Sequence, residues 1–359
     1  MTSKCTIIIP TYNRPIYLKR ILSYYDEYGK DFNIIVADSS SDENKKINKK
    51  IILSFSNLNI LYKTYPVNVR PYYYFKIADS IDQVKTEYCV ICADDDFVTS
   101  SGINLSIEFL ERNPDFVCCQ GNYISFYLKT NKNGQLQFYW KPRPIYKSVT
   151  SSDPKTRLIH RFSDYYQTIW AVHRTDFSNM IWKETMRFTD DARFGELLPS
   201  MLTLIYGKMK RLEVLYGARE ILSDSDSKTY KKFRDIINEA TYAKKYFMFK
   251  DCLATHLSKN SQITIEEAKE LIDKSMSEYI TKNYREFSIN KEFLIQKFIQ
   301  KIDRISNKIP LPSRFYEYIR KVYGKTFRRT LWTTDDSPKE YLDEFNKIKK
   351  ACNIMLKTI

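Results

Sequence analysis

The sequence predicts an α/β protein, with a doubly wound, mostly parallel sheet flanked by helices and an all-helical C-terminal extension. Short apolar runs alternate with amphipathic helical patterns over the first 220 residues, as in parallel strands joined by right-handed helical crossovers. An acidic triplet follows one of these runs, at the position where open α/β sheets bind ligands. From residue 223 onward the pattern is helical only. We therefore expect a domain at 1–222 and a helical domain or extension at 223–359.

The first part of the predicted sheet consists of buried strands separated by helices. Each strand is a short, nearly unbroken apolar run, which is too short for a core helix and typical of a strand covered on both faces. The strands are expected at residues 5–10, 32–37, 59–65 and 88–93. The helices between them are expected at residues 15–28, 43–55 and 72–83. Pro15 can open the first helix and Gly29 can end it.

Residues 100–222 are expected to complete the sheet. A helix is predicted to begin near Ser100 and to end before Pro114. Further strands are expected at residues 116–128, 136–140, 168–173 and 211–216, with a hairpin turn at 131–134. An amphipathic helix is predicted at 194–206, ended by Gly207. In the helical extension, a capping box at 337–340 predicts the start of another helix.

The acidic triplet is the most informative stretch of the chain. Asp94, Asp95 and Asp96 directly follow the apolar run at 88–93. Three adjacent carboxylates repel one another, so a fold gains little stability from placing them at the end of a buried strand. A divalent cation relieves the repulsion, and carboxylate oxygens suit Mg²⁺ or Mn²⁺, which usually share their coordination shell with substrate phosphates. A solvated acidic turn is the alternative interpretation.

The net charge is strongly positive and unevenly distributed. The chain carries +15 at pH 7, and residues 291–329 contain 11 Lys and Arg against 3 Asp and Glu, a net +8. This excess favours an anionic partner: a nucleoside diphosphate, lipid headgroups or nucleic acid. Aromatic residues alternate with the basic ones in 291–329, which is typical of a segment that contacts an anionic membrane or nucleic acid. A solvated basic face on a packed helical subdomain is the alternative.

The cysteines indicate a reducing compartment. There are seven, an odd number, and we find neither a secretion signal nor a run of 18 apolar residues that would span a membrane. Cys89 and Cys92 have zinc-like spacing, but they lie inside an apolar strand without a second Cys or His pair at the right distance. We interpret them as small buried hydrophobic residues.

Four pieces of the chain resemble the nucleotide-sugar-dependent glycosyltransferases of family two, which have the GT-A fold. Within this family the chain is similar to a bacterial branch used in surface-polysaccharide synthesis. The pieces are TIIIPTYNRP at 6–15, VADSS at 36–40, VKTEYCVICADDDFV at 84–98 and RFGELLPSML at 193–202. The resemblance covers residues 4–220 and fades after 222. It implies a GT-A-type fold for the first domain.

The resemblance also implies residues that bind the donor. Pro10, Thr11, Tyr12 and Asn13 match the family's first nucleotide loop, where the aromatic ring packs on the base. Asp38 matches the acidic residue that accepts a hydrogen bond from the base.

Further positions match the part of the family's site that binds the diphosphate. Asp94 and Asp96 match the outer pair of the DxD motif, the first near the ribose and the second on the metal that bridges the diphosphate. Asp95, which lies between them, is also expected to contribute to donor binding. Arg70 lies where the family places a contact to base or phosphate. Arg219 follows the last strand of the domain and can bind the diphosphate bidentately, or it is an ordinary surface arginine.

The catalytic base is expected at the start of the helix at 194–206. Glu196 falls at the family's base position, but Leu197 follows where the family often has a second carboxylate. Asp190 and Asp191 lie near enough in sequence to be alternatives, and Asp191 is kept as a second candidate. A structural role for Glu196 at the positive end of the helix dipole is the other interpretation.

His173 and Arg174 end an expected strand. Both can reach the metal or the phosphates, and His173 is a candidate metal ligand. A surface histidine, or one satisfied by hydrogen bonds inside the protein, is the alternative.

These observations predict a metal-dependent, inverting glycosyltransferase that uses Mg²⁺ or Mn²⁺. It would move a sugar from a nucleotide-sugar donor to a hydroxyl of a glycan or lipid-linked glycan. The expected location is the cytoplasm, with a peripheral position on the inner face of the cytoplasmic membrane if the basic segment binds lipid; nucleic acid is disfavoured as a partner. Nucleotidyl transfer is the alternative activity. A nucleotidyltransferase would need a glycine-rich phosphate loop after the first strand, but the segment TYNRP found there contains no glycine. A non-catalytic basic binding module would leave the acidic triplet unexplained.

Overall fold

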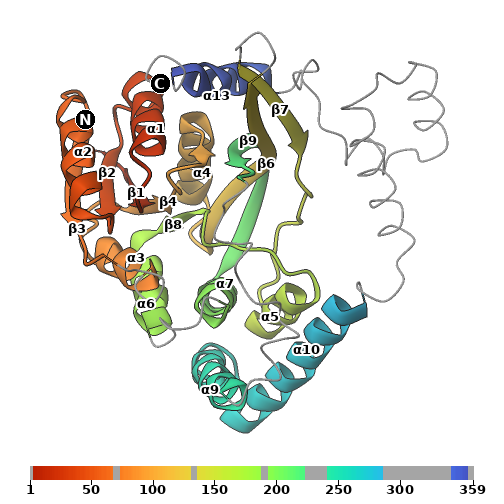
Figure 1. Cartoon of the computed structure of the whole chain (residues 1–359). Coiled ribbons are helices and arrows are strands. Elements are labelled where there is room, and N and C mark those ends of the chain that lie inside the picture. Colours follow the sequence, from red (N-terminus) through yellow and green to blue (C-terminus); the bar gives the residue numbers. More distant parts are fainter. Residues whose placement is uncertain are drawn as a thin grey trace.

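The computed structural model describes residues 3–67, 73–130, 136–186, 193–222, 241–285 and 341–354. Its strands are β1 (Cys5–Thr11), β2 (Asn33–Asp38), β3 (Asn59–Thr64), β4 (Tyr88–Ile91), β5 (Phe97–Val98), β6 (Phe116–Thr130), β7 (Leu136–Pro142), β8 (Val172–Arg174) and β9 (Lys208–Glu220). Its helices are α1 (Pro15–Tyr28), α2 (Asp42–Leu53), α3 (Tyr73–Asp82), α4 (Ser100–Arg112), α5 (Pro154–Ser163), α6 (Thr175–Thr185), α7 (Phe194–Tyr206), α9 (Tyr242–Asn260), α10 (Ile265–Arg285) and α13 (Leu342–Ile354). The elements are shown in Figure 1.

The described strands form one sheet in the order β3-β2-β1-β4-β8-β6-β9-β5, and β7 pairs with β6 outside this path. Strands β3, β2, β1 and β4 are all parallel, so their carboxyl ends meet at one edge. The chain leaves β1 toward β2 on one side and reaches β4 on the other, which makes the crevice between β1 and β4 a topological switch point. The second half of the sheet is mixed, because β8 runs antiparallel to both β4 and β6. The predicted doubly wound fold class is confirmed.

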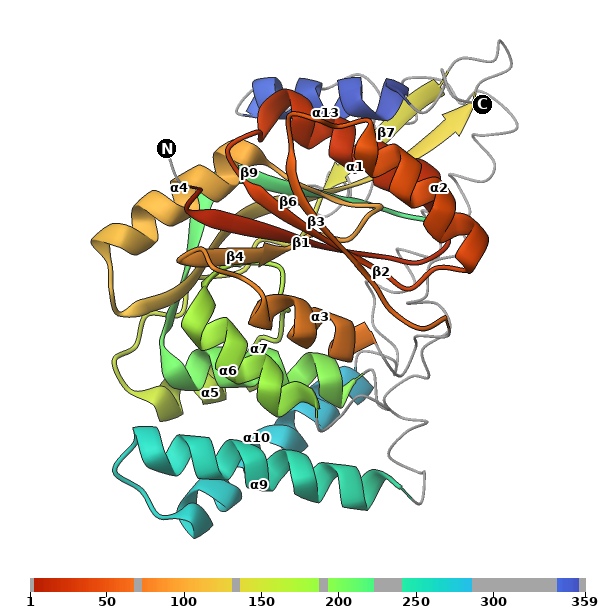
Figure 2. The ribbon, with the colours of Figure 1, turned by 90° about the vertical axis from the view of Figure 1, so that its left-hand side faces the viewer.

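Helices cover both faces of the sheet (Figure 2). Helices α1, α4 and α13 lie on one face, and α3, α6 and α7 lie on the other. The central strand β1 explains this arrangement, because its side chains are buried alternately in two apolar clusters. Ile7 and Ile9 pack under α1, whereas Ile8 packs against α3. A strand buried on both faces reads as a continuous apolar run, as the sequence predicted.

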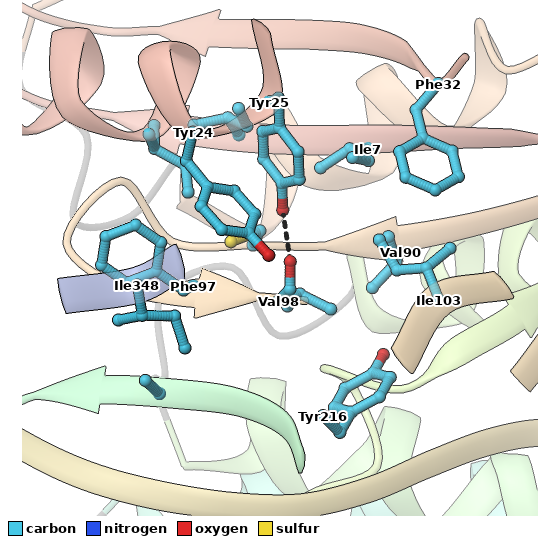
Figure 3. Packing of buried hydrophobic residues seen from close by; sticks show 14 of the residues in the cluster. Ile7, Tyr24, Tyr25, Phe32, Val90, Phe97, Val98, Ile103, Tyr216 and Ile348 are labelled. Atoms are coloured by element: carbon cyan, nitrogen blue, oxygen red, sulfur yellow. Dashed lines mark hydrogen bonds between the residues drawn. The ribbon is translucent and has the colours of Figure 1, made fainter. Parts of the chain in front are cut away.

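The main core also fixes the chain that follows the acidic triplet. Strand β5 comes directly after Asp96, and both of its residues are buried. The Tyr25 hydroxyl donates a hydrogen bond to the carbonyl oxygen of Val98 at 3.1 Å (Figure 3). The rings of Tyr24 and Phe97 meet edge to face with centroids 5.3 Å apart. The triplet is therefore held between two buried strands, β4 before it and β5 after it.

The described part of the chain beyond residue 222 is helical and packs against the first part. Helices α9 and α10 share an apolar cluster with α5 and α7. Helix α13 returns to the main core, where Phe345 packs edge to face on Trp140 with centroids 5.3 Å apart. The boundary at residue 222 stays a prediction. None of the helices within the described ranges is both long enough and apolar enough to cross a membrane.

Some predicted elements need correction. The strand expected at 168–173 is shortened to β8, because the backbone turns at Thr168, whose carbonyl accepts a hydrogen bond from the Ala171 amide. The strand expected at 211–216 is longer and spans all of β9. Cys89 and Cys92 are packed in different apolar clusters, as expected of small hydrophobic residues. The predicted turn at 131–134, the capping box at 337–340 and the basic segment at 291–329 lie outside the described residues.

Candidate active site

Three loops meet at the carboxyl edge of the parallel strands. They follow β1, β2 and β4. Thr11 at the end of β1 lies opposite Asp38 at the end of β2. The Thr11 hydroxyl donates a buried hydrogen bond to Oδ2 of Asp94, 2.6 Å away. The structure therefore brings the expected nucleotide loop and the acidic triplet together at the switch point.

Asn13 connects the first two loops. Its φ is 53°, in the left-handed region that asparagine tolerates better than most residues with a side chain. In this conformation its amide donates to Oγ of Ser40 at 2.8 Å, and its side-chain oxygen accepts from the Ser41 amide at 2.8 Å. The preceding residue, Tyr12, is 45% exposed. The loop is therefore fixed by its asparagine, while the adjacent aromatic ring stays open to a ligand.

Asp38 is buried and fully engaged inside the protein. Its carboxylate accepts hydrogen bonds from the Ser40 amide at 2.7 Å, the Asn48 side chain at 2.8 Å and the Tyr62 hydroxyl at 2.6 Å. These contacts give Asp38 a clear part in shaping the second loop. Its role toward a nucleotide base stays a prediction.

Lys76 is a site residue that the sequence analysis missed. It projects from α3, is 2% exposed, and its Nζ donates to the Thr11 carbonyl at 3.0 Å and to Oγ of Ser39 at 2.9 Å. Burial lowers the pKa of this amine to about 8, although Asp94 and Asp38 act in the opposite direction. A positive charge thus lies beneath the two loops. A lysine within the buried stripe of an amphipathic helix was the available signal.

In the acidic triplet Asp94 is buried, Asp95 and Asp96 are partly buried, and the three negative charges lie close together in the sequence. Burial, followed by repulsion from Asp95, raises the pKa of both Asp94 and Asp96 to about 7. Arg14 partly neutralises the negative charge of two of the aspartates. Its guanidinium lies 2.8 Å from Oδ2 of Asp95 and 3.8 Å from Oδ1 of Asp94. On the other side, Oδ1 of Asp96 accepts a hydrogen bond from the Glu220 amide at 3.0 Å.

These residues fit a divalent cation. The donor set is made of carboxylate oxygens, which Mg²⁺ and Mn²⁺ prefer. The raised pKa values of Asp94 and Asp96 show that the site disfavours their negative charges when no counter-charge is added. A bound dication would supply that charge.

Arg219 lies between the triplet and the expected catalytic base. Its guanidinium is 5.3 Å from the ring centre of Tyr123 and 5.0 Å from that of Trp170, and its Nε is 3.9 Å from Oδ2 of Asp96. Arg219 also lowers the pKa of Glu196. The rings of Tyr123 and Trp170 therefore hold the Arg219 guanidinium in place. From there it interacts electrostatically with the carboxylates of Asp96 and Glu196.

Glu196 lies in the first turn of α7. Burial raises the pKa of its carboxyl to about 7, against the opposing influence of Arg219 and Arg193. Its Oε1 is buried and accepts no hydrogen bond from the described residues. The Glu196 carboxylate therefore combines a raised pKa with one oxygen that is available to a further partner. It lies near Arg219, which also approaches Asp96. Asp190 and Asp191 lie outside the described residues, as does Arg70.

Arg143 is a second cation on this side that the sequence analysis missed. Burial, followed by the neighbouring Arg219, lowers the pKa of its guanidinium, and Asp96 acts in the opposite direction. Its side chain donates to Oγ of Ser125 at 3.1 Å. It follows β7 in a loop without a local motif, so nothing in its sequence neighbourhood marked it.

The structure places His173 inside the sheet rather than beside the triplet, and its role as a metal ligand stays a prediction. It pairs with Cys89 and Cys118 inside the sheet, whereas Asp94 lies five residues beyond Cys89. Its Nε2 lies 2.8 Å from the Thr168 carbonyl oxygen, and burial lowers the pKa of the imidazole to about 4. Arg174 is also structural, since it donates to the Leu110 carbonyl at 2.6 Å.

The fold and the position of the triplet define a protein of the GT-A class, with its Asp-x-Asp pair beside the switch point. Residues 6–178 match the model of glycosyl transferase family 2. For these residues the resemblance seen in the sequence is confirmed. No curated protein sequence matches the chain.

Several solved structures match this chain at low sequence identity. A fragment of S. aureus TarS (residues 1–349) in complex with UDP-GlcNAc is 13% identical, with a TM-score of 0.50, over 98% of this chain and 92% of that fragment. A longer TarS structure gives a TM-score of 0.49 at 13% identity, and the match covers 97% of this chain but 55% of TarS. A mannosyltransferase of Pyrobaculum calidifontis in complex with GDP-Man and Mn²⁺ is 10% identical, with a TM-score of 0.40 over 99% of this chain and 88% of that one.

A buried ion pair supports the triplet and can be tested by mutation. Arg20 and Glu220, 2.6 Å apart, have side chains that are 0% and 4% exposed. Replacing Arg20 with Met leaves Glu220 buried without its cation, and removing one partner of a buried pair costs about 3–5 kcal/mol. We expect Arg20→Met to lower the free energy of unfolding in urea by about that amount, and Arg20→Met/Glu220→Leu to be more stable than Arg20→Met. A double variant less stable than either single variant would contradict this account.

Proposed function

We propose that this chain transfers a sugar from a nucleotide-sugar donor to a hydroxyl of a glycan or lipid-linked glycan, in the synthesis of a bacterial surface polysaccharide. The observation that carries the proposal is the acidic triplet at the switch point, with Glu196 and the triplet both in range of Arg219. The match to family two over residues 6–178 supports sugar transfer. A UDP-sugar is the first donor to test, because the TarS fragment of similar fold was crystallised with UDP-GlcNAc.

The loops after β1 and β2 are assigned to the nucleoside. The half-exposed ring of Tyr12 would pack on the base. Asn13 and Lys76 would keep the two loops in place, because each of them bonds to the second loop from a different side. Asp94, held by Thr11, would lie near the ribose. This arrangement binds the donor at the edge of the sheet with its diphosphate directed toward Asp96.

The diphosphate is assigned to the opposite side of the triplet. Asp96 and Asp94 would hold Mg²⁺ or Mn²⁺, and a bound divalent ion neutralises the charge that develops on the leaving nucleoside diphosphate. Arg219 and Arg143 add fixed positive charge near Asp96. Fixed charges of this kind favour the departing group without reorganisation during the reaction.

Glu196 is assigned as the general base. A group with a pKa of about 7 can accept the proton of an attacking hydroxyl and is still ionised in useful amounts near neutral pH. The deprotonated hydroxyl would attack the anomeric carbon from the side opposite the departing diphosphate, which inverts that centre. Asp191 is the alternative base from the sequence.

The metal assignment predicts the behaviour of Asp96→Ala. Without this carboxylate, we expect calorimetry to detect no Mn²⁺-dependent binding of UDP and expect donor hydrolysis to be abolished, while the melting temperature stays near that of the wild type. Asp343→Ala is the matched control, because Asp343 is an 84% exposed aspartate on α13. Mn²⁺-dependent binding that survives in Asp96→Ala would show that another residue holds the ion.

The base assignment predicts a pH profile. Below pH 7 more of Glu196 is protonated and cannot accept a proton, so kcat of the wild type should fall as the pH decreases through about 7. Glu196→Gln should lose roughly 10²–10⁴-fold in kcat at pH 8 and should no longer show this pH dependence, with donor affinity nearly unchanged.

The stability of the same variant separates catalysis from folding. The pKa of Glu196 in the folded protein lies above its ordinary value of 4.5, so this group's contribution to stability is complete below pH 4.5 and is lost as the pH rises through 7. At pH 8, Glu196→Gln should therefore melt no lower than the wild type. Glu213→Gln, at an 88% exposed side chain, is the control. If Asp191→Asn rather than Glu196→Gln loses the activity, the base is Asp191.

Membrane contact is proposed from the sequence, because residues 291–329 lie outside the described structure. Each basic residue close to an anionic surface contributes about 1 kcal/mol, and the attraction decays over about 8–10 Å at moderate ionic strength. We expect the protein to bind anionic vesicles at low salt, to release them as salt rises, and to ignore neutral vesicles. Changing Lys321, Lys325, Arg328 and Arg329 to Glu should prevent binding and leave donor hydrolysis unchanged. Wild-type protein that ignores anionic vesicles at low salt would refute a peripheral position on the cytoplasmic membrane.

A further inference from the structure

A cluster of three potential metal ligands lies away from the candidate active site, where the last turn of α6 meets α9. Glu184 comes from α6, and Cys252 and His256 come from α9, four residues apart and thus on one face of the helix. The ligand atoms of these three side chains all lie within 4.8 Å of one another. We propose that Glu184, Cys252 and His256 bind a transition-metal ion of the zinc type.

The donor set selects the class of ion. A thiolate, an imidazole and a carboxylate together suit Zn²⁺ and similar borderline ions, whereas Mg²⁺ and Ca²⁺ prefer oxygen ligands alone. The site is therefore chemically distinct from the carboxylate triplet.

The distances are close to those of a bound ion. With Zn–S and Zn–O bonds of about 2.3 and 2.0 Å, tetrahedral geometry places sulfur and oxygen about 3.5 Å apart. Sγ of Cys252 and Oε2 of Glu184 are 3.5 Å apart. Nε2 of His256 and Oε1 of Glu184 are 3.7 Å apart, against about 3.3 Å for ligands with bonds of about 2.0 Å. The two distances are to different oxygens of the Glu184 carboxylate, so a rotation of that carboxylate would bring one oxygen to both partners, in a cluster whose ligand atoms already lie within 4.8 Å of one another.

Tyr206 orients the histidine. Its hydroxyl is hydrogen-bonded to Nδ1 of His256, which leaves Nε2 directed at the other two ligands. A partner on the second ring nitrogen is the usual companion of a metal-bound histidine, because it fixes the tautomer and the ring orientation. The side chains of His256 and Glu184 are 13% and 22% exposed, so an ion can enter and a water molecule can take the fourth position.

The place of the site in the fold indicates a structural role. Glu184 lies near the end of α6, Tyr206 is the last residue of α7, and α9 belongs to the helical extension. These three helices lie side by side in Figure 2, and Phe194 of α7 packs on Phe249 of α9 with ring centres 5.2 Å apart. An ion bound here would connect α6 to α9 of the helical extension, beside α7, the helix that carries Glu196. The proposal does not depend on the proposed sugar transfer.

The test measures metal directly in the full chain, after removal of any affinity tag. We expect elemental analysis to find close to one zinc per chain. After removal of the metal by a chelator, Co²⁺ titration should produce a thiolate-to-Co²⁺ charge-transfer band in the near ultraviolet, and Zn²⁺ should abolish that band and raise the melting temperature. The same band should form in Asp96→Ala, because ions at the carboxylate triplet have no sulfur ligand.

Variants assign the ligands. Cys252→Ser and His256→Gln should remove the band and the stoichiometric zinc, whereas Cys352→Ser, at a buried cysteine on α13, and His160→Gln, on α5, should keep both. Tyr206→Phe should keep the band but weaken metal affinity by roughly 10–100-fold, as expected of a positioning residue.

Three outcomes would overturn the proposal: substoichiometric zinc together with no charge-transfer band in the metal-free chain, a band that persists in Cys252→Ser, or a melting temperature that Zn²⁺ does not raise. In the first case the cluster is an ion pair between Glu184 and a protonated His256, with the Cys252 thiol donating to the carboxylate.

Discussion

The buried ion pair between Arg20 and Glu220 is the contact on which the geometry of the candidate active site depends. Arg20 donates to Glu220 at 2.6 Å and to the Asp95 carbonyl at 2.7 Å. Glu220 in turn presents its backbone amide to Asp96. Burying two charges is expensive, and such a pair is retained only when further contacts satisfy it. Here the guanidinium also lies 5.0 Å from the ring centre of Phe97, so α1, the triplet and β9 form one connected unit.

These contacts of Arg20 and Glu220 keep the three aspartates close together, although the mutual repulsion of their carboxylates disfavours that arrangement. Burial and the neighbouring charge of Asp95 disfavour the ionised forms of Asp94 and Asp96, which explains their raised pKa values. Lys76 and Arg219 approach from opposite sides, but neither forms a short ion pair with them in the described structure. Part of the negative charge thus remains uncompensated. Such a site favours binding of an added cation. The unfavourable free energy of holding these carboxylates in place is offset by stabilising contacts elsewhere in the fold.

The parts predicted from the sequence are those encoded locally. The apolar runs before Thr11 and Asp94 predicted two buried strands, and parallel strands end at the same edge of a sheet. That the two loops form one site was implied by the family resemblance. Lys76 and Arg143 were missed, because each reaches the site from an element whose distance to the triplet depends on tertiary packing. The place of His173 in the sheet could not be predicted for a related reason. Its apolar run predicts a strand, but it does not show that the histidine pairs with the beginning of β4 rather than its end.

The surroundings of Glu196 show that residues before and after position 222 form one site together. Its neighbour Gly195 allows α7 to approach α3 closely, since a Cβ at this glycine would lie 2.5 Å from the ring of Tyr74. On the other side of the same helical turn, Phe194 packs on Phe249 of the extension. One contact fixes this turn against α3 and the other fixes it against α9. The sequence pattern changes from mixed α/β to helical near residue 222. The turn that carries Glu196, the residue assigned as the base, is nevertheless positioned by residues from both sides of that boundary.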